Sequence, residues 1–210
     1  MYRLLNKANR VLSVSWAAGL LAGATLIANL LGLLRERLLL ANFGVGAELD
    51  AYKAAFTIPD FMYFILTSGA LSVTFIPVFN QRLLKGNKKS AWVLSTSLLN
   101  FMAVITLVAS VLIMIFASPL VHIVASGLDD TQTAQAANMM RLIAVNPFLF
   151  SISAVFTSMQ QAVGRFVFFA LAPSFYSIGI ILGTIYLSPY FGIEGVAYGV
   201  VIGSILQLIK

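Results

Sequence analysis

The sequence predicts an all-α integral membrane protein, built as a bundle of six transmembrane helices. Hydrophobic residues make up 60% of the 210 residues and charged residues only 10%, against roughly 45–50% and about 25% in soluble domains. Long runs of the chain contain no Lys, Arg, Asp or Glu. These runs show no two-residue alternation, and helices satisfy their own backbone hydrogen bonds in lipid, so helices are expected and strands are not.

Composition also excludes several kinds of function. A soluble enzyme or soluble binding domain needs a charged surface, which 13 Lys and Arg with 7 Asp and Glu cannot cover. There is no cysteine, and His122 is the single histidine, so thiolate metal sites, cysteine nucleophiles and Ser–His–Asp triads are not expected. We interpret the formal net charge of +6 as the cytoplasmic charge excess of a membrane protein and expect no nucleic-acid partner.

Each expected span has about the 20 apolar residues that cross a bilayer. The first span follows Arg3, Lys7 and Arg10 but is too long for the hydrophobic region of a signal peptide, so it is interpreted as a retained helix. The fourth contains Asn146-Pro147, and the proline predicts a kink there. In chain order, the six spans are expected at residues 11–40, 52–81, 91–117, 134–162, 167–188 and 193–210.

The placement of Lys and Arg predicts that both termini lie in the cytoplasm, because cytoplasmic segments carry the excess of these residues. Nine of the 13 would then lie inside: Arg3, Lys7, Arg10, Arg82, Lys85, Lys88, Lys89, Arg165 and Lys210. The other four would lie toward the outside: Arg35, Arg37, Lys53 and Arg141.

Glycines recur every four residues on three of the expected spans. They are Gly19 and Gly23, Gly179 and Gly183, and Gly195, Gly199 and Gly203. Small residues at this spacing let helix backbones approach closely. Two interpretations remain open from the sequence: packing between helices of one chain, or a dimer face.

Charged residues inside apolar spans are costly and often functional. On the first span, Asn29 and Glu36 share one helical stripe with Thr25 and Gly32, and Arg35 lies beside Glu36. Such a stripe is expected to face protein or water. Arg35 is either an anion-binding residue at the outer end of a cavity or an arginine that reaches the outer interface from a helix end.

The second span carries a similar stripe of Lys53, Thr57 and Asp60, with Asp60 directly after Pro59. A carboxylate at this depth needs a proton or a cationic partner, and Lys53 or Arg35 could supply one. Two interpretations are open: an internal ion pair that fixes the first two helices, or a cavity residue that binds substrate or a coupling cation.

A set of glycine, proline and charged positions forms a recognisable pattern in residues 28–80. Its members are Leu31-Gly32, Arg35, Phe43-Gly44, Gly46, Asp50-Ala51-Tyr52, Pro59, Gly69-Ala70 and Phe75-Ile76-Pro77. A weaker match continues at Gly164-Arg165-Phe166, Ala172-Pro173 and Gly203–Leu208. The chain resembles the MurJ/MviN family of lipid II flippases, which belongs to the multidrug/oligosaccharidyl-lipid/polysaccharide exporter superfamily.

The resemblance implies a function in cell-wall biosynthesis at the bacterial inner membrane: transport of undecaprenyl-linked peptidoglycan precursor between leaflets by alternating access, without catalysis. Residues 1–210 would form the N-terminal lobe, with the C-terminal lobe or a partner half missing. Arg35 would contact the lipid's diphosphate, which arginine binds bidentately. The implied cavity residues are Asn29, Arg35, Glu36, Asp50, Lys53 and Asp60. Besides the lipid-linked substrate, membrane lipids are the expected partners, and no cofactor or metal is expected.

Five positions depart from the family pattern. The family's Ser-Arg pair is Ala28-Asn29, and its asparagine after the proline is Asp60. A second family arginine is Tyr63, and a glutamate is Ser68. The missing arginines and the added acid at Asp60 favour an alternative within the superfamily: a cation-coupled drug or polysaccharide-lipid exporter with Asp60 as the cation site. A membrane scaffold that does not transport is the third interpretation.

Overall fold

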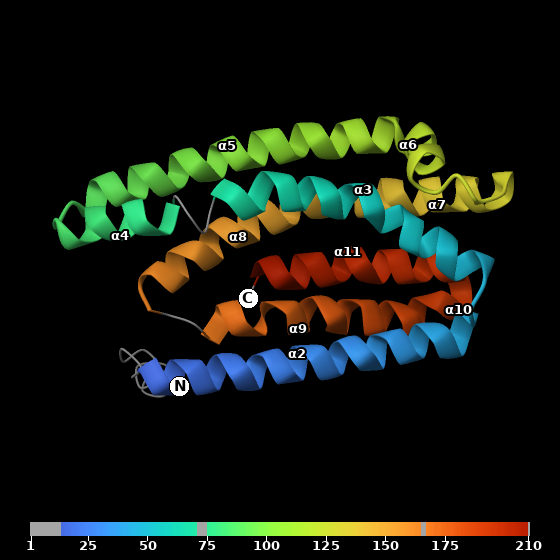
Figure 1. Ribbon diagram of the computed structural model, residues 1–210, viewed down its shortest axis with the longest axis horizontal. Coiled ribbons are helices and arrows are strands. Elements are labelled where there is room, and N and C mark those ends of the chain that lie inside the picture. Colours follow the sequence, from blue (N-terminus) through green and yellow to red (C-terminus); the bar gives the residue numbers. More distant parts are fainter. Residues whose placement is uncertain (1–13, 71–74, 165–166, 210) are drawn as a thin grey trace.

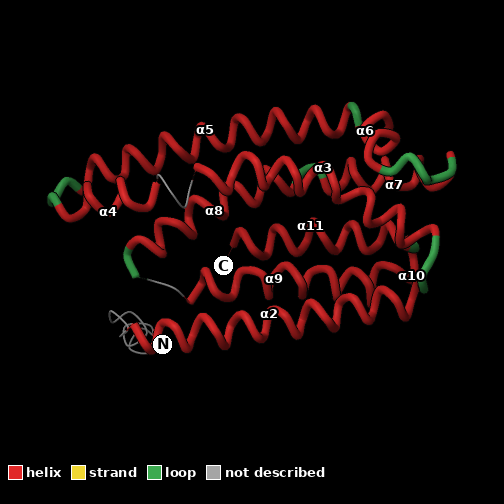
Figure 2. The backbone as a smooth tube through the Cα atoms, viewed as in Figure 1, coloured by secondary structure: helices red, strands yellow, loops and turns green. Residues whose placement is uncertain are grey.

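A computed structural model describes residues 14–70, 75–164 and 167–209 as helices joined by short turns (Figures 1 and 2), with no strand in these ranges. The prediction of an all-α membrane bundle is therefore confirmed. The helices are α2 (Val14–Phe43), α3 (Ala47–Ala70), α4 (Ile76–Leu84), α5 (Lys88–Ile115), α6 (Ala117–Val124), α7 (Asp130–Ile143), α8 (Asn146–Ala162), α9 (Val167–Leu182), the π-helix η2 (Gly183–Leu187), α10 (Ser188–Phe191) and α11 (Ile193–Ile209).

Helix boundaries differ from the expected spans where polar residues begin a helix. The second helix starts at Ala47, before the expected residue 52, with Glu48 and Asp50 in its first turn. Acidic residues are favoured at this end of a helix by the helix dipole. The fourth span begins early because Asp129 and Gln132 form a reciprocal capping box ahead of it. It breaks at the predicted place, since α7 ends at Ile143 and α8 begins at Asn146.

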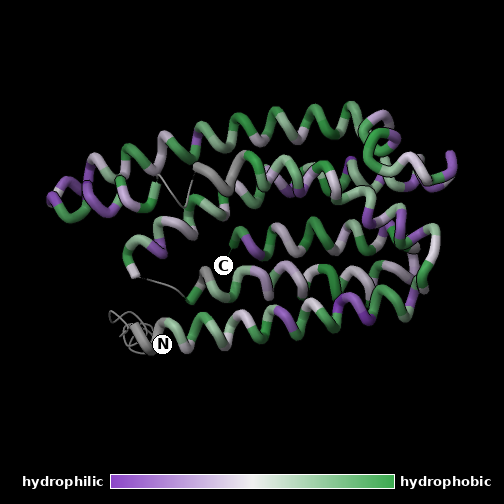
Figure 3. Tube along the Cα trace, viewed as in Figure 1, coloured by the Kyte–Doolittle hydropathy of each residue, from purple (hydrophilic) through white to green (hydrophobic). Residues whose placement is uncertain are grey.

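Four stretches of the described residues are long and apolar enough to cross a membrane, so the chain is a multi-pass membrane protein. These are Ala18–Phe43, Lys88–Ile115, Asp130–Ala162 and Ala170–Phe191. The apolar helix α11 is shorter, and α3 carries several charges. The count of six spans stays a prediction. Hydrophilic residues gather at the α4–α5 turn and at the opposite end of the bundle, whereas α5 is largely hydrophobic (Figure 3).

Two buried clusters hold the bundle together. The larger one joins α3, α6, α7 and α11 through fully buried side chains such as Met140, Ile143 and Val196. The smaller one, around Phe79 and Val155, packs α4 and α5 against α8. In contrast, α2 lies along α9 at one edge of the bundle (Figure 1) and exposes leucines including Leu26, Leu30 and Leu33.

The glycines at four-residue spacing on α9, η2 and α11 form a backbone-to-backbone contact within the chain. A Cβ atom added to Gly179 would lie 2.2 Å from the Cα of Gly203, and one added to Gly183 would lie 2.5 Å from the Cα of Gly199. On α2, by contrast, Gly19 has no atom within 4 Å of such a Cβ, and neither has Gly23. Of the two interpretations that the sequence left open, packing within the chain is therefore correct for α9 and α11.

Candidate functional site

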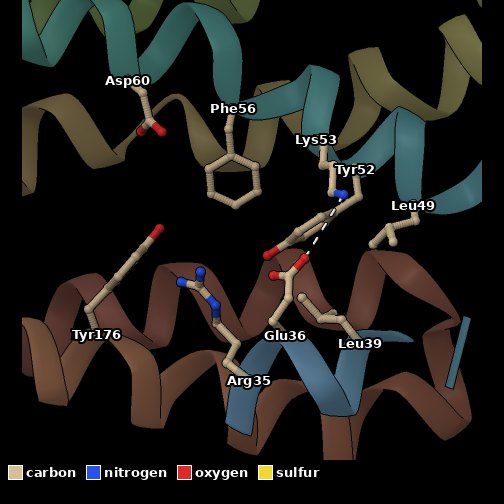
Figure 4. A pocket seen from close by; sticks show the side chains of 9 residues that line it. All are labelled: Arg35, Glu36, Leu39, Leu49, Tyr52, Lys53, Phe56, Asp60 and Tyr176. Carbon is tan, nitrogen blue, oxygen red and sulfur yellow. Dashed lines mark ion pairs between the residues drawn. The ribbon is translucent and has the colours of Figure 1, made fainter. Parts of the chain in front are cut away.

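A pocket of about 240 Å³ lies between α2 and α3, and α9 contributes one residue to it (Figure 4). The turn that joins α2 to α3 contains Gly44, whose φ of +67° is a conformation that glycine adopts readily. The turn brings the C-terminal half of α2 beside the N-terminal half of α3. Nine residues line the pocket: Arg35, Glu36, Leu39, Leu49, Tyr52, Lys53, Phe56, Asp60 and Tyr176.

One ion pair crosses the pocket from helix to helix. Lys53 Nζ on α3 lies 3.9 Å from Glu36 Oε1 on α2 (Figure 4). The two side chains are 58% and 42% exposed. An ion pair this open to its surroundings contributes about 0–1 kcal/mol in solvent. The ion pair therefore contributes little to the stability of the α2–α3 contact, and its main effect is to hold two charges at the pocket.

Arg35 directs its guanidinium group into the same pocket, toward the side where Asp60 and Tyr176 lie (Figure 4). Its Nε atom is buried and has no hydrogen-bond partner among the described residues. A buried donor without a partner costs free energy, and an anionic oxygen would satisfy it with a strong, charge-assisted bond. Arg35 is thus the group in this pocket best suited to contact an anion.

Asp60 lies on the α3 side of the pocket, above Tyr176 (Figure 4). The sequence suggested Lys53 as one partner for this carboxylate, but Lys53 pairs with Glu36 instead. In the described ranges no ion pair within 4 Å includes Asp60. The pocket therefore holds two cations and two carboxylates. Lys53 and Glu36 form an ion pair with each other, whereas Arg35 and Asp60 form none within the described ranges.

Aromatic rings support the pocket from three helices. Tyr52 packs edge-on against Phe56, one helical turn along α3, with ring centroids 4.8 Å apart. Tyr176 on α9 packs against Phe150 on α8 at 5.2 Å, and Phe150 in turn packs against Tyr63 at 5.4 Å. Tyr63 thus supports the pocket wall through Phe150.

The structure brings together four of the six predicted site residues: Arg35, Glu36, Lys53 and Asp60. The other two do not line the pocket. Asp50 is exposed in the first turn of α3, and Asn29 is exposed on α2, well before Arg35 in the chain. Across the described ranges, no three His, Asp or Glu side chains are grouped closely enough to hold a metal ion.

Sequence reasoning missed the five uncharged lining residues. Tyr52 and Phe56 could have been predicted, because they precede Asp60 by eight and four residues and so lie on the same face of a helix. Tyr176 could not, because only the packing of α9 and α8 brings it opposite α3.

Comparisons with known proteins agree with this architecture. The sequence profile of the family described as "Lipid II flippase MurJ" matches residues 39–210. The lipid II flippase MurJ of Thermosipho africanus is 29% identical over 93% of this chain and 40% of its own length. A probable lipid II flippase MurJ of Bdellovibrio bacteriovorus is 31% identical over 91% of this chain and 38% of its own length.

A solved structure of lipid II flippase MurJ in an inward closed conformation superposes with a TM-score of 0.76 at 29% identity. The match covers 90% of this chain and 40% of that one. The chain thus spans about 40% of the length of the relatives that it matches. Since the family profile matches well over half of the chain, the chain belongs to the lipid II flippase MurJ family.

Proposed function

We propose that this chain forms one lobe of a flippase that moves a lipid-linked peptidoglycan precursor across the bacterial inner membrane. Family membership over residues 39–210 supports the substrate class. The observation that carries the proposal is the pocket between α2 and α3, where the buried and unpartnered Nε of Arg35 faces into the space. The function is transport, and the pocket's residues bind and release the substrate without chemical change.

The pocket suits the diphosphate and not the whole lipid. Its volume of about 240 Å³ is below the roughly 300–1,000 Å³ of pockets that enclose drug-sized ligands. A diphosphate is small and doubly anionic, and the planar guanidinium of Arg35 can donate two parallel hydrogen bonds to it. The sugars and the polyprenyl chain would remain outside this pocket, in the rest of the transport pathway and in lipid.

Alternating access needs a second unit against which this one can move. The chain spans about 40% of the length of its relatives, so we propose that a further lobe completes the pathway. The pocket lies beside α2, the helix at the edge of the bundle that packs mainly on α9 (Figure 1). An arriving lobe could therefore enclose the pocket without displacing the buried clusters.

A rescue experiment tests the proposal. Residues 1–210 are fused to the part of the Thermosipho africanus relative that this chain does not match, and the fusion is expressed in cells depleted of their own lipid II flippase. The fusion should restore growth, and Arg35→Ala should abolish it. Arg37→Ala is the matched control, because Arg37 lies on the same helix, is exposed and does not line the pocket. Growth that survives Arg35→Ala at equal protein level would contradict the role of Arg35.

One observation favours cation coupling as a second candidate. Asp60 faces the pocket and forms no ion pair within the described ranges. A carboxylate in this position could bind and release a proton or metal cation as the lobes rock. In liposomes that contain the fused transporter, Asp60→Asn should then remove the dependence of transport on a cation gradient. Unchanged dependence would exclude Asp60 as the coupling site.

A further inference from the structure

A second cavity, separate from the pocket around Arg35, opens between α5, the α7–α8 junction, α10 and α11. It encloses about 660 Å³ and is lined almost entirely by apolar side chains. Its lining includes Met114 near the end of α5, Leu187 and Phe191, and Ile202 on α11. This apolar groove belongs to the half of the bundle that holds α6, α7 and α10 (Figure 1), the predicted outer half.

One charged residue, Arg141, lies on the wall of the apolar groove. Its Nη1 donates to Asn138 Oδ1 at 2.9 Å, and its Nη2 donates to Ser118 Oγ at 3.1 Å. Both partners are neutral, so they fix the orientation of the guanidinium without cancelling its charge. In the described parts of the chain no carboxylate lies within 4 Å of Arg141.

The surroundings of the apolar groove restrict what can fill it. Ile202 and Phe191 are 39% and 54% exposed, so the groove opens on the outer surface of the bundle. None of the lining residues lies on α2, beside which the further lobe is proposed to pack, so this surface would face lipid in a membrane. An empty apolar groove would lose the dispersion contacts of its lining, and its apolar walls offer water few hydrogen-bond partners. A hydrocarbon chain fills such a space, and its volume lies within the roughly 300–1,000 Å³ of ligand pockets.

We propose that the apolar groove binds an anionic phospholipid of the outer leaflet. One acyl chain lies against Phe191 and Ile202, and the phosphate accepts hydrogen bonds from Arg141. Arginine and phosphate form strong, charge-assisted hydrogen bonds. An uncompensated arginine at the edge of the hydrocarbon is costly, so the lipid that neutralises it is favoured. Net headgroup charge selects an anionic lipid over a zwitterionic one.

Native mass spectrometry of the purified full chain tests this proposal. The protein in detergent is mixed with phosphatidylglycerol or with phosphatidylcholine of the same acyl chains, and the bound lipids are counted. The wild type should retain phosphatidylglycerol preferentially. Arg141→Ala should weaken that retention by about fivefold, the contribution of one basic residue at an anionic lipid surface. Arg37→Ala is the control, because Arg37 is exposed on α2 and does not line the groove. It should retain the preference.

A second variant tests the groove independently of the charge. Ile202→Trp places a larger side chain in the groove and should reduce retention of both lipids. Its elution volume and circular dichroism should match those of the wild type, which shows that the variant is folded. The proposal is overturned if Arg141→Ala keeps the preference, if Arg37→Ala loses it equally, or if Ile202→Trp binds lipid as the wild type does. A dimer that Ile202→Trp dissociates would identify a second copy as the occupant and would also overturn it.

Discussion

The contact between α9 and α11 leaves no space for a side chain at the glycines that form it. At Gly199, an added Cβ would lie 2.6 Å from the Cα of Gly183 and 2.8 Å from the carbonyl oxygen of Gly179. Two carbon atoms pack best at about 3.5–4.0 Å. Gly199→Ala therefore requires α9 and α11 to separate by roughly 1 Å, and both neighbours are backbone atoms, which cannot rotate away as a side chain can.

The expected destabilisation follows from two opposing effects. Overpacking of a close contact costs about 1–3 kcal/mol, and a rigid backbone neighbour favours the upper end of that range. Replacing glycine by alanine in a helix stabilises it by up to about 1 kcal/mol. The net loss for Gly199→Ala is then about 2 kcal/mol. For Gly23→Ala, where no atom lies within 4 Å of the new Cβ, only the favourable effect remains.

Unfolding in mixed micelles with increasing denaturing detergent measures both variants. Gly199→Ala should unfold at a lower detergent fraction than the wild type, and Gly23→Ala should unfold at the same fraction or a higher one. Chromatography should show the same oligomeric state for all three proteins, because the contact lies within the chain. Equal stability of Gly199→Ala and Gly23→Ala would refute the backbone contact. If the wild type were a dimer and Gly199→Ala a monomer, the glycines would instead form an interface between two copies of the chain.

Three further changes test the pocket and the core. Asp60→Asn removes a negative charge that faces Arg35. The affinity of the purified chain for inorganic pyrophosphate, measured by calorimetry, should therefore rise about fivefold, which corresponds to a part-exposed charge contact of ~1 kcal/mol. A fall in affinity would contradict the arrangement. Lys53→Met breaks an exposed ion pair, so stability in the micelle assay should change by less than about 1 kcal/mol. Ser204→Ala leaves the buried Oδ1 of Asn146 without its hydrogen bond, which should lower stability by about 1–3 kcal/mol; an unchanged midpoint would argue against that bond.

The fold class and most of the charged pocket can be predicted from the sequence, because a bilayer strongly restricts which residues a spanning helix can contain. A charge in an apolar run is rare, so Arg35 and Asp60 stand out from the residue pattern alone. Asp60 lies on a polar helical stripe and Arg35 lies beside one; such stripes are expected to face protein or water, and both residues line the pocket. Asn29 shares a stripe with Glu36 but lies outside the pocket, because periodicity gives the face of a helix and not the depth at which a neighbour packs. Asp50, which only the family resemblance implied, also lies outside the pocket.

The elements that the sequence does not reveal depend on contacts between distant segments. Tyr176 enters the pocket because α9 packs beside α2 and Phe150 braces its ring, and no local pattern reports such packing. The same holds for the glycines. Their spacing allows a close approach of backbones, but only the structure shows that Gly179 meets Gly203 while Gly23 meets nothing within 4 Å.

The charges of the pocket explain how a site with both signs can accept an anion. Arg35 and Lys53 are matched by Glu36 and Asp60, so the charges of the pocket balance and cost less to keep within the membrane. The Lys53–Glu36 pair is long, at 3.9 Å, and exposed, and such pairs are held weakly. An anion that binds Arg35 would therefore compete with Glu36 for Lys53. Because such a pair contributes at most about 1 kcal/mol, separating Lys53 from Glu36 would cost little of the stability of the contact between α2 and α3.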